Sequence, residues 1–376
     1  MLMSSKCIPG LLWSVLLPGA LLASVLTGPA ASASPSSEPD VTDDVNGIVF
    51  ASVQVGDRTF VGGEFTTAGG QPHLNAAAIA ADGTVDPTWA PELNDRVYSL
   101  AASQDGSMIY LGGEFTTVNG ASRARLVAVD AVTGDLVRGW RANAPAEVSA
   151  LAVSGDRLYA GGLFRRIDGA AAPRLAALTA STGEVDNTFA PRPDGKVNSL
   201  VVSPDGQRLY AGGRFTTVAG VSRPGIAELD PTSGAATSFA PEGGGTVRAV
   251  ALTPDGSRLF FSTLSNLTWA YDPAQSNTPR YTVKTGGDVQ AIAVSATEVY
   301  VGGHFGQIIG QPHLDRPRLA SFQVSDGTPT DFRVELDSFF GVWTLTVTPQ
   351  YLVVGGAFEN VNGQPQQGFA RFSGTV

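Results

Sequence analysis

Short apolar runs, each ended by glycine, proline or a polar turn, follow one another along most of the chain. One stretch shows the pattern well, with the runs Val97–Ala102, Met108–Gly113, Leu126–Asp130 and Val137–Trp140 separated by turns such as Gln104-Asp-Gly. Runs of this length, with no apolar period that lasts beyond one helical turn, indicate β-strands. We call the four runs of such a unit strands A, B, C and D. The pattern predicts an all-β protein of antiparallel hairpins.

The unit recurs about every fifty residues. A Gly-Gly pair ends strand B in six units, and Ser262-Thr263 occupies the same place in the fifth. The pairs are Gly62-Gly63, Gly112-Gly113, Gly161-Gly162, Gly212-Gly213, Gly302-Gly303 and Gly355-Gly356. A period near fifty is typical of propellers and longer than that of helical solenoids. Seven units fill residues 45–376, so we predict one seven-bladed β-propeller of four-stranded antiparallel blades.

The first 33 residues are predicted to be a cleavable signal peptide. Lys6 precedes an uncharged run at Leu11–Leu26, and Ala31-Ser32-Ala33 offers small residues for cleavage. The run is shorter than the about 20 residues of a membrane-spanning helix, so we expect a secreted protein without a membrane span. Residues 34–44 form a polar leader. It is expected either to be loose or to complete the last blade, whose own fourth strand is missing.

Composition excludes several classes of function. The net charge of −10 argues against nucleic acid as a partner, because such partners need a basic surface. Three histidines and one cysteine, Cys7 in the signal segment, leave little for a zinc, haem or iron–sulfur site. We therefore expect no cofactor and a monomer, with Ca²⁺ as the one metal that the acidic loops described below could attract.

A varied position near the start of strand A suggests a binding site. We place a valine first in strand A of every unit, whereas the next residue is aromatic or hydrogen-bonding and differs between units. The seven varied residues are Asn46, Tyr98, Ser149, Asn198, Arg248, Gln290 and Trp343. Strand A lines the central channel of a propeller, so we predict that they form a ligand-binding mouth. Ordinary water-filled channel lining is the alternative. Arg248 is expected to be neutralised by Glu242 or Glu92.

An acidic residue stands in every linker from strand D to the next strand A. Because D–A linkers and B–C loops share one face of a propeller, these side chains would form an acidic rim around the mouth. The rim consists of Asp44, Asp95, Glu147, Asp194, Glu242, Asp288 and Asp337. Such a rim could attract Ca²⁺ or a cationic partner. The alternative is that these are ordinary solvated loop residues.

Two segments also resemble a known family. Tyr110–Asp130 and its near-copy Tyr210–Asp230 resemble the β-propeller repeat of secreted, mostly actinobacterial proteins, domain of unknown function 5122. The resemblance implies the propeller fold and brings no established activity. A more distant similarity is to kelch repeats and the propeller of galactose oxidase. The copper chemistry of that enzyme needs a Cys–Tyr crosslink, which a chain without Cys7 cannot form.

No motif for nucleophilic catalysis is present, since Gly-x-Ser-x-Gly does not occur. We therefore expect a secreted, non-enzymatic propeller. It would bind a small polar ligand, a glycan or a protein partner on the face of the D–A and B–C loops. An extracellular hydrolase, lyase or lactonase is one alternative, because fold does not decide chemistry. A structural scaffold of the cell envelope is another.

Overall fold

The computed structural model describes residues 34–310 and 313–374, so the predicted signal peptide lies outside the described residues. In this range every element of regular secondary structure is a β-strand, which confirms the all-β prediction. Among the described residues there is no helix with the length and hydrophobicity to cross a membrane. The described residues belong to the unit Ser32–Val376.

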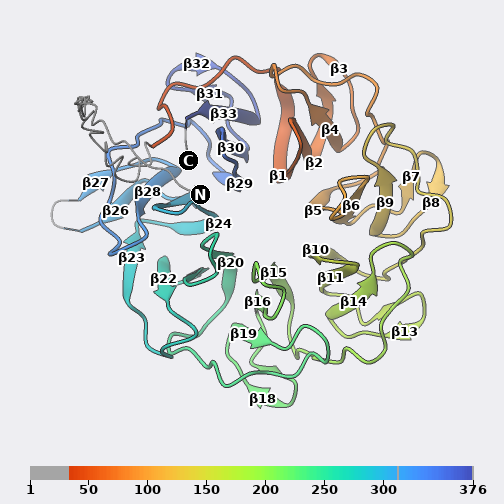
Figure 1. Cartoon of the computed structure of the whole chain (residues 1–376). Helices are drawn as coiled ribbons and strands as arrows, with labels where there is room; N and C mark the ends of the chain where they lie inside the picture. The colour runs from red at the N-terminus through yellow and green to blue at the C-terminus, as the bar shows by residue number, and fades with distance from the viewer. Residues whose placement is uncertain (1–33, 311–312, 375–376) are drawn as a thin grey trace, which may run out of the picture. The chain divides into compact units, whose positions relative to one another are not determined.

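Within this unit the main sheets follow one another around a common centre (Figure 1). Their innermost strands, strand A of each repeat, are β1 (Val45–Val55), β5 (Val97–Ala102), β10 (Val148–Ser154), β15 (Val197–Val202), β20 (Val247–Leu252), β24 (Asp288–Val294) and β29 (Val342–Val347). The second strands are β2 (Arg58–Ala68), β6 (Met108–Gly113), β11 (Arg157–Gly162), β16 (Leu209–Gly213), β21 (Leu259–Thr263), β25 (Glu298–His304) and β30 (Tyr351–Gly356). The third strands are β4 (Ala76–Ile79), β9 (Leu126–Asp130), β14 (Leu175–Thr179), β19 (Ile226–Leu229), β22 (Leu267–Tyr271), β28 (Leu319–Gln323) and β33 (Phe369–Ser373).

Very short strands form ribbons in the loops between second and third strands. They are β3 (Gln71–Pro72), β7 (Thr117–Val118), β8 (Ala121–Ser122), β12 (Arg166–Ile167), β13 (Ala170–Ala171), β17 (Thr217–Val218), β18 (Val221–Ser222), β26 (Gln307–Ile309), β27 (Leu314–Asp315), β31 (Asn360–Val361) and β32 (Gln364–Pro365). The fifth repeat has no such ribbon. There β21 and β22 are joined directly by a short turn.

The predicted fourth strand is reduced in most repeats to an isolated bridge. In the second repeat, a single bridge joins Leu136 to Val129 of the third strand, just before the predicted strand Val137–Trp140. The backbone then turns away at Gly139, whose φ of 83° favours glycine. In the fifth repeat, β23 (Tyr281–Thr285) is a full fourth strand, and it pairs on its outer side with β26.

A glycine–valine contact joins each sheet to the next. A Cβ atom added to Gly112 would lie 2.7 Å from Val148 Cγ1, so only glycine permits this approach. The same contact occurs at Gly62–Val97, Gly161–Val197, Gly212–Val247 and Gly302–Val342. A Cβ on Gly355 would lie 2.6 Å from Val49 Cγ1, so the last sheet packs on the first in the same way. The sheets therefore form a closed ring.

Ser262 takes the glycine position in the fifth repeat and makes the contact by hydrogen bonding. Its hydroxyl donates to Val289 O (3.0 Å) and accepts from Ala249 N (3.2 Å). Val289 stands in β24 at the position of the valines that contact glycine in the other repeats. A buried serine is therefore compatible with this interface because both of its hydrogen-bonding roles are filled.

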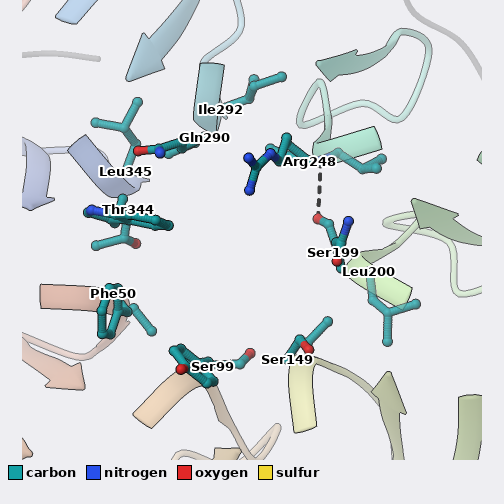
Figure 2. Close-up of a pocket in the computed structure, with 18 of the residues that line it drawn as sticks. Phe50, Ser99, Ser149, Ser199, Leu200, Arg248, Gln290, Ile292, Thr344 and Leu345 are labelled. Carbon is teal, nitrogen blue, oxygen red and sulfur yellow. Dashed lines mark hydrogen bonds between the residues drawn. The ribbon is translucent and has the colours of Figure 1, made fainter. Parts of the chain in front are cut away.

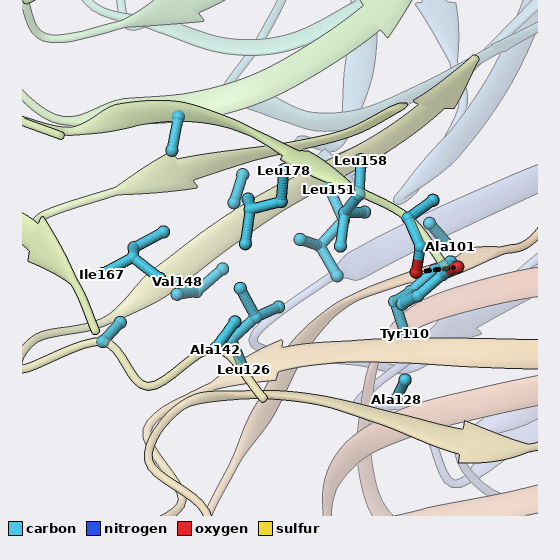
Figure 3. Close-up of a cluster of buried hydrophobic side chains, with 14 of the residues drawn as sticks. Ala101, Tyr110, Leu126, Ala128, Ala142, Val148, Leu151, Leu158, Ile167 and Leu178 are labelled. Atoms are coloured by element: carbon cyan, nitrogen blue, oxygen red, sulfur yellow. Dashed lines mark hydrogen bonds between the residues drawn. The ribbon is translucent and has the colours of Figure 1, made fainter. Parts of the chain in front are cut away.

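The hydrophobic core lies between neighbouring sheets. Between the second and third repeats, Leu126 packs with Val148, Leu158 and Leu178 in one buried cluster (Figure 3). Aromatic side chains at the edge of this cluster also form hydrogen bonds through their polar atoms. The Tyr110 hydroxyl donates to Ala180 O at 2.9 Å, and Trp140 Nε1 donates to the same oxygen at 2.8 Å.

The polar leader, residues 34–44, lies along β33. Ser36 N donates to Ser373 O (2.8 Å), and Asp40 N donates to Arg371 O (2.7 Å). The Arg371 side chain, only 7% exposed, donates through Nε to Asp40 Oδ2 at 2.9 Å. The beginning of the described chain is thus hydrogen-bonded to its last strand, at the place where a fourth strand would lie.

Candidate ligand-binding site

A β-bulge in each innermost strand directs one side chain toward the centre. The register of β5 against β6 shifts between Val97 and Ser99, which leaves Tyr98 without a paired residue. The shift recurs at the same step of the other innermost strands. The bulged residues are Phe50, Tyr98, Ser149, Asn198, Arg248 (with Ala249), Gln290 and Trp343. Bulges free a side chain from the sheet and re-aim it, which explains why this position varies.

The bulged residues surround the central space, where two cavities meet. An outer cavity of about 480 Å³ and an inner one of about 210 Å³ are both lined by these seven side chains. Figure 2 shows Phe50, Ser149, Arg248 and Gln290 around this space. Six of the seven residues predicted for the mouth therefore lie together. The outer cavity is further lined by Glu64, Arg96, Glu147, Lys196 and Phe340, of which the sequence analysis had named only Glu147.

Asn46 is the exception, and its prediction was wrong. It is exposed in β1, four residues before Phe50, and is not among the residues that line the two central cavities. Its Oδ1 accepts from Thr66 N (3.0 Å) and Thr67 N (2.7 Å) of β2. The valine equivalent to Val97 is Val49. The sequence carried a signal, since Val45 stands 18 residues before Gly63 but Val49 only 14, within the 14 to 16 of the other units.

Three consecutive repeats supply the aromatic part of the wall. The rings of Phe50 and Trp343 lie 5.2 Å apart at 90°, and those of Phe50 and Tyr98 lie 5.3 Å apart at 55°. The Tyr98 hydroxyl donates to Glu114 Oε2 at 3.1 Å. Burial raises the pKa of Tyr98 to about 12, so its phenol is neutral at physiological pH.

The other four repeats supply the polar part of the wall. The Ser149 hydroxyl donates to Glu147 Oε1 (2.7 Å), and Asn198 Nδ2 donates to Val247 O (2.7 Å). The Gln290 amide, oriented as its surroundings require, donates through Nε2 to Phe340 O at 3.3 Å. These bonds hold three uncharged polar groups in place along the cavity wall.

Charges around the outer cavity occur in pairs. Arg96 Nε donates to Glu64 Oε2 at 2.8 Å, and Lys196 Nζ lies 2.5 Å from Glu147 Oε1. Each pair joins neighbouring repeats. The charged side chains that line the outer cavity therefore largely neutralise one another.

Arg248 is paired with Asp288, and not with Glu242 or Glu92 as predicted. Arg248 Nη2 lies 3.6 Å from Asp288 Oδ2, whereas Arg248 Nε is buried and has no hydrogen-bond partner in the described part of the chain. Asp288 directly precedes Val289 at the start of the next innermost strand.

Most of the predicted rim carboxylates accept hydrogen bonds from nearby backbone N–H groups. Asp194 Oδ1 accepts from Thr216 N (2.7 Å) and Thr217 N (3.0 Å), and hydrogen bonding from Thr216 lowers the pKa of Asp194 below its usual range. Asp337 accepts in the same manner from Glu359 N (2.9 Å). Asp44 accepts from Gln367 N, and Asp95 from Arg96 N. Within residues 34–310 and 313–374, no three His, Cys, Asp or Glu side chains are grouped so that they could hold a metal.

Comparisons with known proteins agree with this architecture. Residues 57–88 and 204–236 match the model of a family described as a domain of unknown function (DUF5122) β-propeller. Each matched segment covers the second and third strands of one repeat, β2 to β4 and β16 to β19. A comparison with curated proteins found no match. The chain thus carries the repeat of the DUF5122 β-propeller family, a family of unknown function, as the sequence resemblance predicted.

Proposed function

We propose that the chain is a secreted, seven-bladed β-propeller that binds an uncharged, hydroxyl-rich ligand, such as a saccharide, in the central cavity. The blade number is supported by the series of glycine–valine contacts, which returns from Gly355 to Val49. The isolated bridges, and the leader that lies along β33, support a fourth strand position in each blade. Secretion is supported by the predicted signal peptide, which is a feature of the sequence alone.

The observation that carries the binding proposal is the two-sided wall of the cavity. Trp343, Phe50 and Tyr98 form a continuous aromatic stretch, and the polar residues occupy the remaining repeats. A sugar ring has a similar division, because its C–H face stacks on aromatic rings while its hydroxyls form hydrogen bonds. A channel that only holds water gives no reason for three large aromatic side chains to lie side by side at bulged positions, where pairing within the sheet does not require them.

The charge pattern favours a neutral ligand. Arg248, which could attract an anion, faces Asp288, and Lys196 and Arg96 are paired with carboxylates. A charged ligand would have to displace one of these pairs. An uncharged ligand can instead use the hydroxyl and amide groups of the wall without such a cost.

A glycan array followed by calorimetric titration with the bound saccharide tests the proposal. Trp343→Ala should weaken binding by about 5- to 150-fold, since losing an aromatic anchor costs roughly 1–3 kcal/mol. Phe339→Ala is the matched control, because this ring is 71% exposed and outside both cavity linings, and it should bind normally. Equal weakening in the two variants, or an array without any bound saccharide, would overturn the proposal. Analysis of the saccharide after incubation would reveal cleavage, which would instead favour the hydrolase or lyase alternative.

A further inference from the structure

Glu298 is a buried carboxylate that lacks a compensating charge. It opens β25 and is only 4% exposed. One oxygen accepts the hydroxyl of Ser34, whereas Oε2 is buried and has no hydrogen-bond partner. An ionised carboxylate removed from water is costly unless a cation or several donors satisfy it. The neutral hydroxyls of Ser34 and Tyr300 lie beside the carboxyl group of Glu298, but no cation of the described residues forms an ion pair with it.

Other repeats place arginine where the sixth repeat has Glu298. Arg58 also stands four residues before the first Gly of its pair. It binds Asp86 of its own repeat at 2.6 Å and donates to Ala131 O of the following repeat at 2.7 Å. Arg157 and Arg258 make the equivalent bonds to following repeats, through Pro231 O and Val324 O. In these three repeats the arginine at this position reaches toward the next repeat.

In the sixth repeat the charge is reversed, so the partner from the last repeat has to be a hydrogen-bond donor, and a cation would compensate the buried Glu298 best. The corresponding place in the last repeat is Gly374, directly after β33, and the leader packs against it, since Ser36 N donates to Ser373 O and a Cβ on Gly374 would lie 2.7 Å from Pro35 Cα. Ser34 contacts Glu298 through its hydroxyl. Three covalent bonds join Oγ to the backbone nitrogen of Ser34, so that nitrogen lies within about 4 Å of the hydroxyl oxygen.

We propose that cleavage between Ala33 and Ser34 is a maturation step that completes this site. Hydrolysis breaks the C–N bond of the peptide. Water supplies the hydroxyl of the new Ala33 carboxyl group and a proton to the new amine of Ser34. At neutral pH the carboxyl group then releases its proton and the amine takes one up from solvent. The resulting α-ammonium is the cation that Glu298 lacks. In the uncleaved chain the same nitrogen is a neutral amide. The proposal shares the signal-peptide cleavage with the proposed function but does not depend on the ligand cavity.

The first measurement is the amino terminus of the exported protein, determined by Edman sequencing or mass spectrometry. We expect Ser34. The second is thermal unfolding of a form that begins at Ser34, beside a form that keeps Ser32-Ala33 in front of it. The Ser34 form should unfold about 2–4 °C higher, because it alone forms the ion pair. Selective acetylation of its α-amine should remove this advantage. A different terminus, or equal unfolding temperatures for the two forms, would overturn the proposal.

Glu298→Gln tests whether the effect passes through Glu298. In this variant the two forms should unfold at the same temperature. Glu184→Gln, at an exposed position, is the matched control and should keep the full difference. A difference that persists in Glu298→Gln would refute the assigned partner. Saccharide binding, measured in parallel, should be equal for all forms because the cavity is unchanged, so failure of either proposal can be told from failure of the other.

Discussion

Replacing Gly112 with alanine tests whether the glycine–valine contact sets the spacing between neighbouring sheets. The new Cβ would lie 2.7 Å from Val148 Cγ1, whereas carbon atoms pack at about 3.5–4.0 Å. The two sheets would have to separate by nearly 1 Å, or the valine would have to leave its preferred position. Overpacking of this kind costs about 1–3 kcal/mol of the free energy of unfolding.

A second substitution, Val148→Ala, shows how much of the stability cost of Gly112→Ala arises from the contact with Val148. Val148→Ala removes both Cγ atoms, and the nearest Val148 atoms to the alanine at position 112 are then Cβ and O at 3.3 Å. Val148→Ala alone should cost roughly 1.6 kcal/mol for the two lost methyl groups, plus a cavity term. The double variant should be about as stable as Val148→Ala, so the two costs should fall short of additivity by at least about 1 kcal/mol.

Equilibrium unfolding in urea, followed by tryptophan fluorescence, measures these free energies. Gly306→Ala serves as the control, because nothing lies within 4 Å of its added Cβ, and its unfolding midpoint should stay nearly unchanged. If the costs of Gly112→Ala and Val148→Ala are simply additive, the two residues do not act through a shared contact. The spacing between sheets would then have another origin.

Three further predictions concern the serines and the leader. Ser262→Ala should lower the free energy of unfolding by about 1–3 kcal/mol, because Val289 O loses its buried donor, and an unchanged thermal midpoint would contradict this. The hydroxyl of Ser103 is the main cause that lowers the pKa of Asp105 to about 2, so its stabilising contribution is present above about pH 4 and is lost as the pH falls toward 2. Ser103→Ala should raise that pKa, as followed by carboxyl ¹³C NMR, and an unshifted titration would count against the bond. Arg371→Gln should expose the leader to limited proteolysis, and equal cleavage rates in both proteins would show that this arginine does not hold it.

The repeat architecture could be predicted because its cause is local in the sequence. Each sheet needs a residue without a side chain at the point where the next valine approaches, and that demand returns once per repeat. Gly62, Gly112 and their equivalents therefore mark the contacts between sheets. Even the exception follows the rule, since Ser262 stands where a hydrogen bond can replace the close approach.

The cavity residues were predictable wherever the strand start was unambiguous. β1 is 11 residues long and contains valines at positions 45 and 49, which lie on the same face because side chains alternate. The alternation therefore could not choose between Asn46 and Phe50, and the choice depended on which valine meets Gly355. The partner of Arg248 was equally hidden, because it comes from the next repeat and depends on how two sheets are turned against each other.

The hydrogen bonds between the leader and β33 also bear on the order of events during folding. Asp40 and Arg371 are separated by 331 residues, so their bond can form only after nearly the whole chain has been synthesised. Sheets in the middle of the chain can assemble from near neighbours, but the ring cannot close until its last strand is available, and contacts so distant in sequence form slowly. Until then the first and last sheets present open edges, which can pair with another chain. At high concentration, refolding should therefore yield dimers in which the leader of one copy lies on β33 of another.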